Sequence, residues 1–321
     1  MRYIDLHCDT LLKCHLDGIV LRENSVHLDL VRAKKAGLMA QFMAIFTPTH
    51  DIAEQYGITQ GPGDFFDTCM EVYKRELVAN DDLIMPALSA QDIADNNLAG
   101  KMSSILTLED GAIVGGDLRR LDALHGLGVR LITLTWNYVN CFGYPQSKDA
   151  DAMKLGLKPF GIDAVRHMND LGIIVDVSHL SAGGFYDVAW HSKKPFCASH
   201  SCCRALCDVS RNLTDDQLKA LGNRGGVCGM NFAPLFLEKG SMYAKIDTIV
   251  RHMKHVADKA GIGAVAFGSD FDGIPGELEL GGCEGMPLLI DALGKEFKES
   301  EIEMICSGNA LRLIGECLHI N

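Results

Sequence analysis

The chain has 321 residues, 47% of them hydrophobic and 22% charged, which is enough to bury a large core. A net charge of -12 and the lack of any basic block argue against a nucleic-acid partner or an anionic membrane partner. The first apolar run begins at residue 3 with no signal-like segment before it, and no apolar run in the sequence reaches the roughly 20 residues of a spanning helix.

Twelve cysteines are scattered along the sequence. Several of them, such as Cys197 and Cys228, lie inside apolar runs, where cysteine behaves as a small hydrophobic residue. Cys202 and Cys203 are adjacent, which suits neither a zinc knuckle nor a simple disulfide bridge. We therefore expect reduced thiols and a cytoplasmic location.

Short apolar runs with strand character alternate with amphipathic, helix-like segments. The eight predicted strands are Tyr3–Asp9, Leu38–Phe46, Ser103–Glu109, Val129–Thr135, Ile173–His179, Phe196–His200, Gly226–Phe232 and Ala264–Asp270. Apolar character at every position, as in Ile173–Val175, is typical of strands buried on both faces. Such alternation implies parallel strands with helical crossovers, and eight units predict a (β/α)8 TIM barrel built as a single domain over residues 1–321.

The interval between the second and third predicted strands, about residues 47 to 102, is too long for a bare loop. We expect helices there at Phe65–Ala79 and Ala90–Leu98. The glycine-rich stretch at 276–285, after the eighth predicted strand, is typical of a mobile loop.

Two capping-box patterns predict where other helices begin. Thr214 is followed three residues later by Gln217, and Ser300 is followed by Glu303 at the same spacing. In this pattern the first side chain accepts a hydrogen bond from the backbone of the fourth residue, whose own side chain reaches back.

Six residues with metal-binding side chains close the predicted strands. They are His7, Asp9, Glu109, His179, His200 and Asp270, on the first, third, fifth, sixth and eighth strands. A single histidine at a strand end is more often structural than a ligand. Because barrel enzymes build their sites at the carboxyl ends of the strands, six such residues at five strand ends indicate a metal site.

The ligand types indicate the chemistry. Three histidines and at least two carboxylates suit zinc, or manganese or cobalt. Glu109 lies in chain order between the strand-one pair and the later histidines, so it is the natural bridge between two ions. Two ions about 3.5–4 Å apart would turn a bridging water into hydroxide near neutral pH and polarise a carbonyl, which predicts hydrolysis of an acyl bond. Asp270 would then shuttle a proton to the leaving amine.

Six short motifs occur together in this chain. They are Asp5-Leu6-His7-Cys8-Asp9-Thr10, Leu108-Glu109-Asp110-Gly111, Gly172-Ile173-Ile174-Val175-Asp176-Val177-Ser178-His179, Ala198-Ser199-His200-Ser201, Ser210-Arg211-Asn212 and Gly268-Ser269-Asp270-Phe271-Asp272-Gly273. With them the chain resembles the renal (membrane) dipeptidase family, zinc peptidases of the amidohydrolase superfamily, over nearly its whole length. The resemblance implies a (β/α)8 barrel, two zinc ions and hydrolysis of free dipeptides. It also suggests tolerance of a D-residue at the substrate's C-terminal position, and a homodimer.

The resemblance also assigns roles to residues. It implies that His7 and Asp9 bind one zinc ion, that Glu109 bridges, and that His179 and His200 bind the other. Two further residues would act on the substrate. Arg211 would hold its terminal carboxylate, and Asp270 would transfer protons.

One segment departs from the family pattern. Family members often carry a histidine after the Leu-Thr that ends the fourth strand, where it contacts the tetrahedral intermediate, whereas this chain has Trp136 after Leu134-Thr135. Either Trp136 replaces that histidine, or Asn137 or Asn140 supplies a neutral donor. The departure keeps open a related amidohydrolase that acts on N-acyl amino acids or lactones. A metal-dependent binding protein without catalysis is a third hypothesis.

Overall fold

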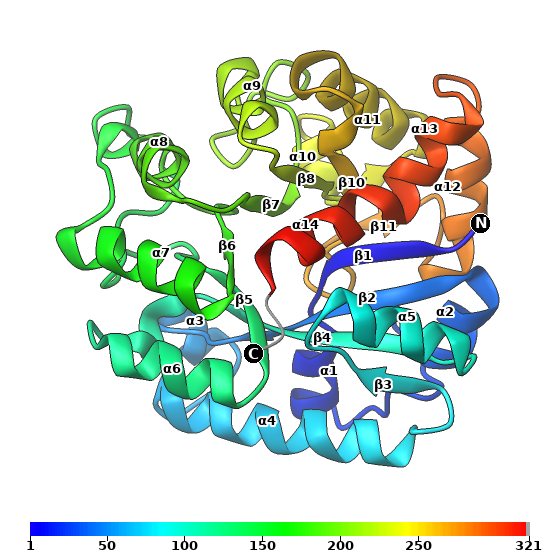
Figure 1. Ribbon diagram of the computed structural model, residues 1–321, viewed down its shortest axis with the longest axis horizontal. Coiled ribbons are helices and arrows are strands. Elements are labelled where there is room, and N and C mark those ends of the chain that lie inside the picture. The colour runs from blue at the N-terminus through cyan, green and yellow to red at the C-terminus, as the bar shows by residue number, and fades with distance from the viewer. Residues whose placement is uncertain (319–321) are drawn as a thin grey trace.

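Eight parallel strands close into a barrel in the computed structural model, which describes residues 1–318 apart from the side chains of residues 50 and 51. The barrel strands are β1 (Tyr3–Cys8), β2 (Leu38–Phe46), β4 (Met102–Glu109), β5 (Val129–Thr133), β6 (Ile174–Asp176), β7 (Cys197–Ser201), β8 (Val227–Met230) and β10 (Val265–Phe267). They pair in the order β2-β1-β10-β8-β7-β6-β5-β4, and pairing of β2 with β4 closes the ring. The predicted (β/α)8 barrel in a single domain is confirmed (Figure 1).

Helices surround the ring and connect its strands. They are α1 (Thr10–Leu16), α2 (Leu30–Ala36), α3 (His50–Gln55), α4 (Pro62–Ala79), α5 (Ala90–Leu98), α6 (Leu118–Gly126), α7 (Pro159–Leu171), α8 (Ala182–His191), α9 (Asp215–Asn223), α10 (Pro234–Leu237), α11 (Ile246–Ala260), α12 (Met286–Leu293), α13 (Glu299–Glu303) and α14 (Asn309–Cys317). Both helices predicted between the second and third strands are present, as α4 and α5. In the view of Figure 1, α14 crosses in front of the strands.

Local sequence explains several helix ends. Thr214 begins α9 with the predicted capping box, its hydroxyl accepting from the Gln217 backbone N–H at 3.2 Å. The second predicted box is wrong, because α13 already begins at Glu299 and the backbone N–H of Lys298 donates to the Glu301 carboxylate. Gly172, at a φ of 80°, ends α7 in the left-handed conformation that glycine adopts without strain.

Three short strands lie outside the barrel ring and were not predicted. β3 (Ile84–Pro86) pairs with the first residues of β4, and is too short to give a periodic pattern. β9 (Tyr243–Ala244) and β11 (Glu277–Leu278) pair with each other. The glycine-rich stretch expected to be a mobile loop therefore contains a paired strand.

The barrel interior is filled by one buried apolar cluster, to which all eight barrel strands contribute. Its buried members include Ile4, Leu6, Ala40, Phe42, Ile105, Leu131, Ile174, Cys197, Val227 and Ala266 from the strands, with Ala310, Leu313 and Ile314 from α14. These strand residues precede the predicted ligands on their strands, so α14 covers the amino-terminal end of the barrel. The carboxyl-terminal end remains available for a site, as in other barrels of this type.

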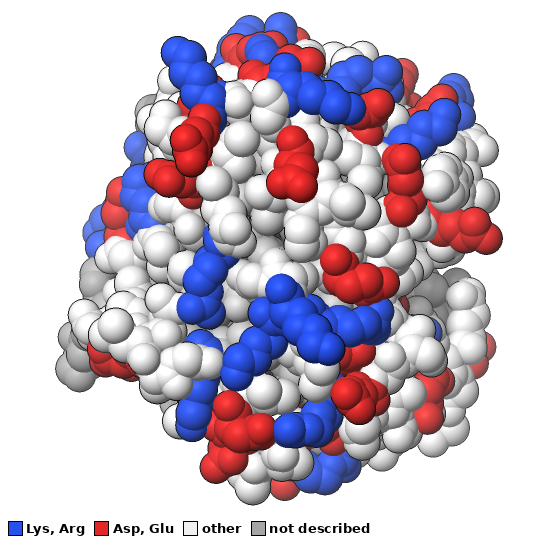
Figure 2. All heavy atoms as spheres, turned by 90° about the vertical axis from the view of Figure 1, so that its right-hand side faces the viewer, with Lys and Arg blue, Asp and Glu red and all other residues white. Residues whose placement is uncertain are grey.

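The surface carries both signs of charge. On the face seen in Figure 2, small groups of lysine and arginine side chains alternate with acidic ones. All twelve cysteines are unpaired, and eleven of them are buried. Within residues 1–318, none of the helices combines the length and the apolar character needed to cross a bilayer.

Candidate metal centre

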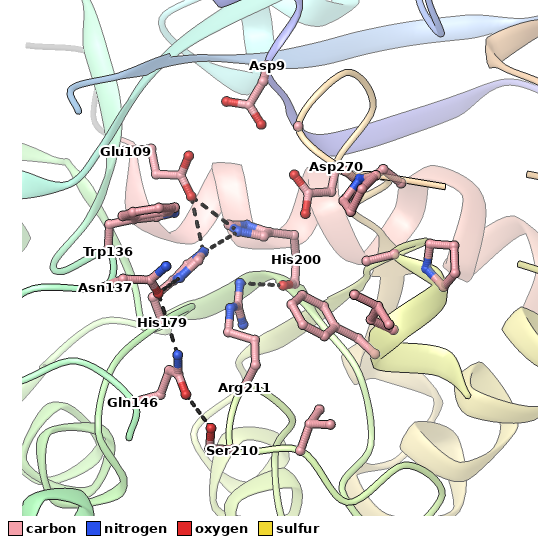
Figure 3. A pocket seen from close by; sticks show the side chains of 18 of the residues that line it. Asp9, Glu109, Trp136, Asn137, Gln146, His179, His200, Ser210, Arg211 and Asp270 are labelled. Carbon is pink, nitrogen blue, oxygen red and sulfur yellow. Dashed lines mark hydrogen bonds and ion pairs between the residues drawn. The ribbon is translucent and has the colours of Figure 1, made fainter. Parts of the chain in front are cut away.

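The six predicted ligand residues meet at the carboxyl-terminal end of the barrel. Figure 3 shows Asp9, Glu109, His179, His200 and Asp270. The six side chains are almost inaccessible to solvent: His7 1%, Asp9 6%, Glu109 5%, His179 10%, His200 1% and Asp270 12% exposed. They come from five different strands or the turns directly after them. Because the carboxyl ends of all the barrel strands lie at one face, residues as far apart in the chain as His7 and Asp270 come together there.

Two of these residues lie in turns after their strands, and not at the last strand position as was predicted. The predicted strands ended at His179 and Asp270, but β6 ends at Asp176 and β10 at Phe267. His179 has a φ of 67° and Asp270 a φ of 63°, a left-handed conformation that no strand accommodates. Such conformations cost on the order of 1–3 kcal/mol each and cluster at functional sites. The turns place the His179 side chain beside Glu109 and the Asp270 side chain beside His7.

Glu109 occupies the middle of the centre. Its Oε1 lies 3.2 Å from His179 Nε2 and 3.4 Å from His200 Nε2, and these two nitrogens are 3.1 Å apart. Its Oε2 faces the other side, 3.7 Å from His7 Nε2. His7 Nε2 is in turn 3.4 Å from Asp9 Oδ2 and 3.8 Å from Asp270 Oδ1. One carboxylate thus joins two groups of ligand atoms.

The donor set fits zinc. Ligand atoms about 2.0–2.1 Å from a tetrahedral ion lie about 3.3 Å from one another, close to the 3.1–3.4 Å separations around Glu109 Oε1. His7 Nε2 and Asp9 Oδ1 are buried and have no hydrogen-bond partner among the described residues. Buried polar atoms are rarely left without a partner, so these two atoms are available to a bound ion. His7 Nδ1 also has no hydrogen-bond partner among the described residues.

Burial and the charges of neighbouring groups shift the pKa values of His7, Glu109 and Asp270. Burial alone lowers the pKa of His7, but the charges of Asp9 and Glu109 outweigh burial and raise this pKa to about 10. Burial raises the pKa of Glu109 well above its ordinary value and the pKa of Asp270 to about 6. The raised pKa values of Glu109 and Asp270 favour bound protons or cations at these two carboxyl groups, and divalent ions would displace those protons.

The other two histidines are held neutral. Burial, followed by the charge of Arg211, lowers the pKa of His179 well below its ordinary value. Burial and the neighbouring His7 do the same to the pKa of His200. The rings of His7 and His200 stack with centroids 3.9 Å apart. A neutral imidazole has a free lone pair, which is the form that binds a metal.

Three neighbouring residues contact the predicted ligands and restrict their positions. Asn137 Oδ1 is 3.2 Å from His179 Nδ1, and Asn231 Nδ2 donates to Asp270 Oδ2 at 2.8 Å. Gly273 comes so close that a side chain there would overlap the Asp9 carboxylate and approach Asp270 Oδ1. Asn231 and Gly273 had no predicted role, although Asn231 lies near the end of the seventh predicted strand, where the same positional rule could have found it.

A cavity of about 510 Å³ opens over the centre. Asp9, Glu109, His179, His200 and Asp270 form its polar floor. Its walls are largely apolar and include Leu12, Phe46, Trp136, Phe236 and Ile274. Its volume is within the range of small-molecule sites, and a few convergent polar groups within apolar walls are typical of them.

Arg211 borders this cavity and is buried rather than on the surface. Its Nη1 donates to Ser201 Oγ and its Nη2 to the His200 carbonyl, both at 2.9 Å. Its Nε has no hydrogen-bond partner, and the guanidinium forms no close ion pair, among the described residues. A buried cation without a bonded carboxylate favours an anionic ligand.

The structure decides between some of the alternatives for the segment that departs from the family pattern. Trp136 and Asn137 both line the cavity, and the Trp136 ring lies 5.9 Å from the ring of His179. The Asn140 alternative is wrong, because its amide donates to Asp110 Oδ1 and the Leu134 carbonyl, and its oxygen accepts from a backbone N–H. Asn140 therefore holds the loop together.

Comparison with known proteins agrees with this geometry. Residues 1–320 match the sequence model of the membrane dipeptidase family, peptidase family M19. The chain belongs to this family. An uncharacterised dipeptidase of Schizosaccharomyces pombe is 35% identical over 255 residues, which cover 78% of this chain and 61% of that protein.

Solved structures of the M19 family share the fold closely. A dipeptidase AC of family M19 superposes with a TM-score of 0.89 at 28% identity, with 99% of both chains covered. A metallopeptidase of Rhodobacter sphaeroides, bound to a phosphinate mimic of the dipeptide L-Ala-D-Ala, gives a TM-score of 0.88 at 27% identity over 99% of both chains. The protein is therefore a metallo-dipeptidase of the M19 family.

Proposed function

We propose that this M19 dipeptidase is a binuclear zinc enzyme that hydrolyses free dipeptides, including those with a D-residue at the C-terminal position. The position of Glu109 supports two ions most directly, because its two carboxylate oxygens face different ligand groups. His7 and Asp9 hold one ion, and His179 and His200 hold the other. The structure of the Rhodobacter sphaeroides relative with its L-Ala-D-Ala mimic supports the inclusion of D-residues.

Each residue has a distinct task in this proposal. Divalent ions held at the centre would lower the pKa of a bound water and would polarise the carbonyl group of the substrate. Asp270 accepts the proton of the attacking water and delivers it to the leaving amine. Asn231 fixes one oxygen of Asp270, which leaves Oδ1 facing the centre. The apolar walls limit the access of bulk water.

We expect Arg211 to bind the substrate's terminal carboxylate. A charge-assisted hydrogen bond contributes about 1.5–3 kcal/mol, so Arg211→Ala should lower kcat/KM for free dipeptides by about 10- to 100-fold. A dipeptide amide, which lacks the carboxylate, should be affected much less. Steady-state kinetics on matched free and amidated dipeptides measure this difference, and an equal loss on both substrates would show that the clamp is wrong.

A substrate panel tests the function directly. Zinc-reconstituted protein is incubated with L,L and L,D dipeptides, N-acylated dipeptides, tripeptides, N-acyl amino acids and lactones, with metal-free protein as the control. We expect zinc-dependent cleavage of free dipeptides. We expect no cleavage of N-acylated dipeptides or of tripeptides. Activity on N-acyl amino acids or lactones without activity on dipeptides would overturn the proposal. Trp136, which lines the cavity at the departing segment, is the observation that favours this alternative.

Two further expectations complete the proposal. Twelve unpaired cysteines support a reducing compartment such as the cytoplasm. Burial raises the pKa of several of these thiols, including that of Cys228 to about 12, which disfavours the reactive thiolate. The homodimer stays a prediction, and sedimentation or light scattering tests it.

A further inference from the structure

Two buried aspartate–serine pairs join neighbouring strands directly behind the metal centre. Ser199 donates its backbone N–H to Asp176 Oδ1 at 2.8 Å and its hydroxyl to Oδ2 at 2.6 Å. Ser269 donates to Asp5 in the same way, at 2.8 and 2.5 Å. All four residues are fully buried, and each serine is followed directly by a residue of the centre.

The two pairs differ in their contact with an imidazole ring. Ser199 Oγ lies 2.7 Å from Nδ1 of the His200 ring and 3.4 Å from Ser178 Oγ. Within residues 1–318, the hydrogen bonds of the Ser269 hydroxyl go to the Asp5 carboxylate and to backbone groups. The pair at Asp5 therefore offers a natural comparison, with the same aspartate–serine geometry but no contact with an imidazole.

The direction of the hydrogen bonds follows from the surroundings of Asp176. Its Oδ1 accepts from the backbone N–H groups of Ser178 and Ser199, and its Oδ2 accepts from the hydroxyls of Thr133 and Ser199. A carboxylate can only accept, so the single hydroxyl hydrogen of Ser199 points to Asp176. The Ser199 oxygen then accepts from His200, whose Nδ1 carries the proton.

This arrangement determines which nitrogen of His200 is free. A neutral imidazole carries one N–H, so a proton on Nδ1 leaves a lone pair on Nε2. Nε2 is the atom that lies 3.4 Å from Glu109 Oε1 and 3.1 Å from His179 Nε2. His179 follows the same rule, with its Nδ1 at 3.2 Å from the amide oxygen of Asn137.

We propose that Asp176 and Ser199 are positioning residues that hold His200 in the Nδ1–H tautomer and so present its Nε2 to the metal. The proposal rests on the metal centre proposed above. A partner at the second ring nitrogen commonly orients a histidine ligand, and its removal typically lowers metal affinity about 10- to 100-fold. The partner here is a serine whose hydroxyl is itself oriented by a buried carboxylate.

Asp176→Asn tests this direction. Because Oδ1 accepts from two backbone N–H groups, the asparagine oxygen must take that position and its NH2 must face Ser199 and Thr133. The NH2 would donate to both hydroxyls, so Ser199 would turn its own hydrogen toward His200 Nδ1. His200 would then carry its proton on Nε2, where the metal binds.

The experiment compares Asp176→Asn, Ser199→Ala and the double variant with the matched controls Asp5→Asn and Ser269→Ala. Zinc affinity is measured by competition with a chelator at pH 7. The cobalt-substituted proteins are examined by proton NMR, in which the Nδ1–H of each bound histidine gives a shifted, solvent-exchangeable signal. His200→Ala identifies the signal of His200 and shows whether this residue binds metal at all.

We expect Asp176→Asn to lower the affinity of one zinc by about 10- to 100-fold and to remove the His200 signal, while the controls retain both. Ser199→Ala in the Asp176→Asn background should restore part of the affinity, because the reversed donor is gone. Equal losses of zinc affinity in Asp176→Asn and Asp5→Asn, or no recovery of affinity in the double variant, would overturn the proposed role of Asp176 and Ser199. If Asp176→Asn does not fold, Ser199→Ala against Ser269→Ala decides by the same two readouts. Unchanged zinc binding in His200→Ala would instead refute the metal centre.

Discussion

Replacing His200 with alanine is expected to remove one of two zinc ions and to lower kcat by on the order of 10³-fold or more. Its Nε2 lies 3.4 Å from Glu109 Oε1, on the side of the centre that it shares with His179. His179→Ala should behave in the same way. Glu109→Ala should weaken the binding of both ions, because one carboxylate oxygen of Glu109 faces His7 and the other faces His179. Zinc content by elemental mass spectrometry and kcat on a free dipeptide are measured on the same samples.

His255→Ala is the control for these variants. His255 is a partly buried histidine whose Nε2 bonds to Asp215 Oδ1 at 2.7 Å, outside the metal centre. Its replacement should leave two zinc ions and near-normal turnover. A His200→Ala protein with full zinc content and normal kcat would show that the assignment of the ligands is wrong.

Replacing Asp270 with asparagine is expected to lower kcat by about 10²–10⁴-fold while both zinc ions remain bound. The carboxamide keeps the shape of the side chain but cannot accept and return a proton as a carboxylate does. Asp272→Asn is the matched control, because its carboxylate accepts from Thr10 Oγ1 at 2.5 Å and from the His27 backbone N–H at 2.7 Å instead of facing the cavity. If Asp272→Asn loses more activity than Asp270→Asn, then Asp272 carries the proton, and the role that we propose for Asp270 is wrong.

The pH dependence of Asp270 gives an independent check. Burial raises the pKa of its carboxyl group to about 6. The carboxylate is the form that accepts a proton, so kcat/KM should decline as the pH falls through this value. Bound zinc adds positive charge and lowers the midpoint, which places the acid limb at pH 6 or below. Asp270→Asn should lack this limb, and zinc content measured at each pH separates it from loss of metal.

The barrel and the meeting of the candidate ligand residues could be predicted because both follow from local pattern and topology. Alternating apolar runs and amphipathic segments indicate parallel strands with crossovers, and closure of the barrel brings all strand ends to one edge. His7, Glu109 and His200 lie at such ends, so their meeting follows without knowledge of any contact. The predicted strand boundaries were less accurate, as for β6 and β10, because a left-handed turn leaves no periodic signal in the sequence.

The partners of the ligands could not be predicted. Asn231 bonds to Asp270 across 39 residues, and Ser199 bonds to Asp176 across 23 residues. Such contacts depend on strand register and on side-chain rotamers, which residue type alone does not determine. Burial of Arg211 has the same origin, since its guanidinium bonds to the His200 carbonyl at the border of the cavity.

The sequence by itself determined the fold class, the family and the set of candidate metal-binding side chains, because periodicity and the order of strand ends are properties of the chain. The tertiary structure decided how the two oxygens of Glu109 lie between the histidines, and it placed the Ser199 hydroxyl beside Nδ1 of His200. Those features depend on distances of a few ångströms between different strands. They are set when the barrel closes and the buried polar groups find their partners.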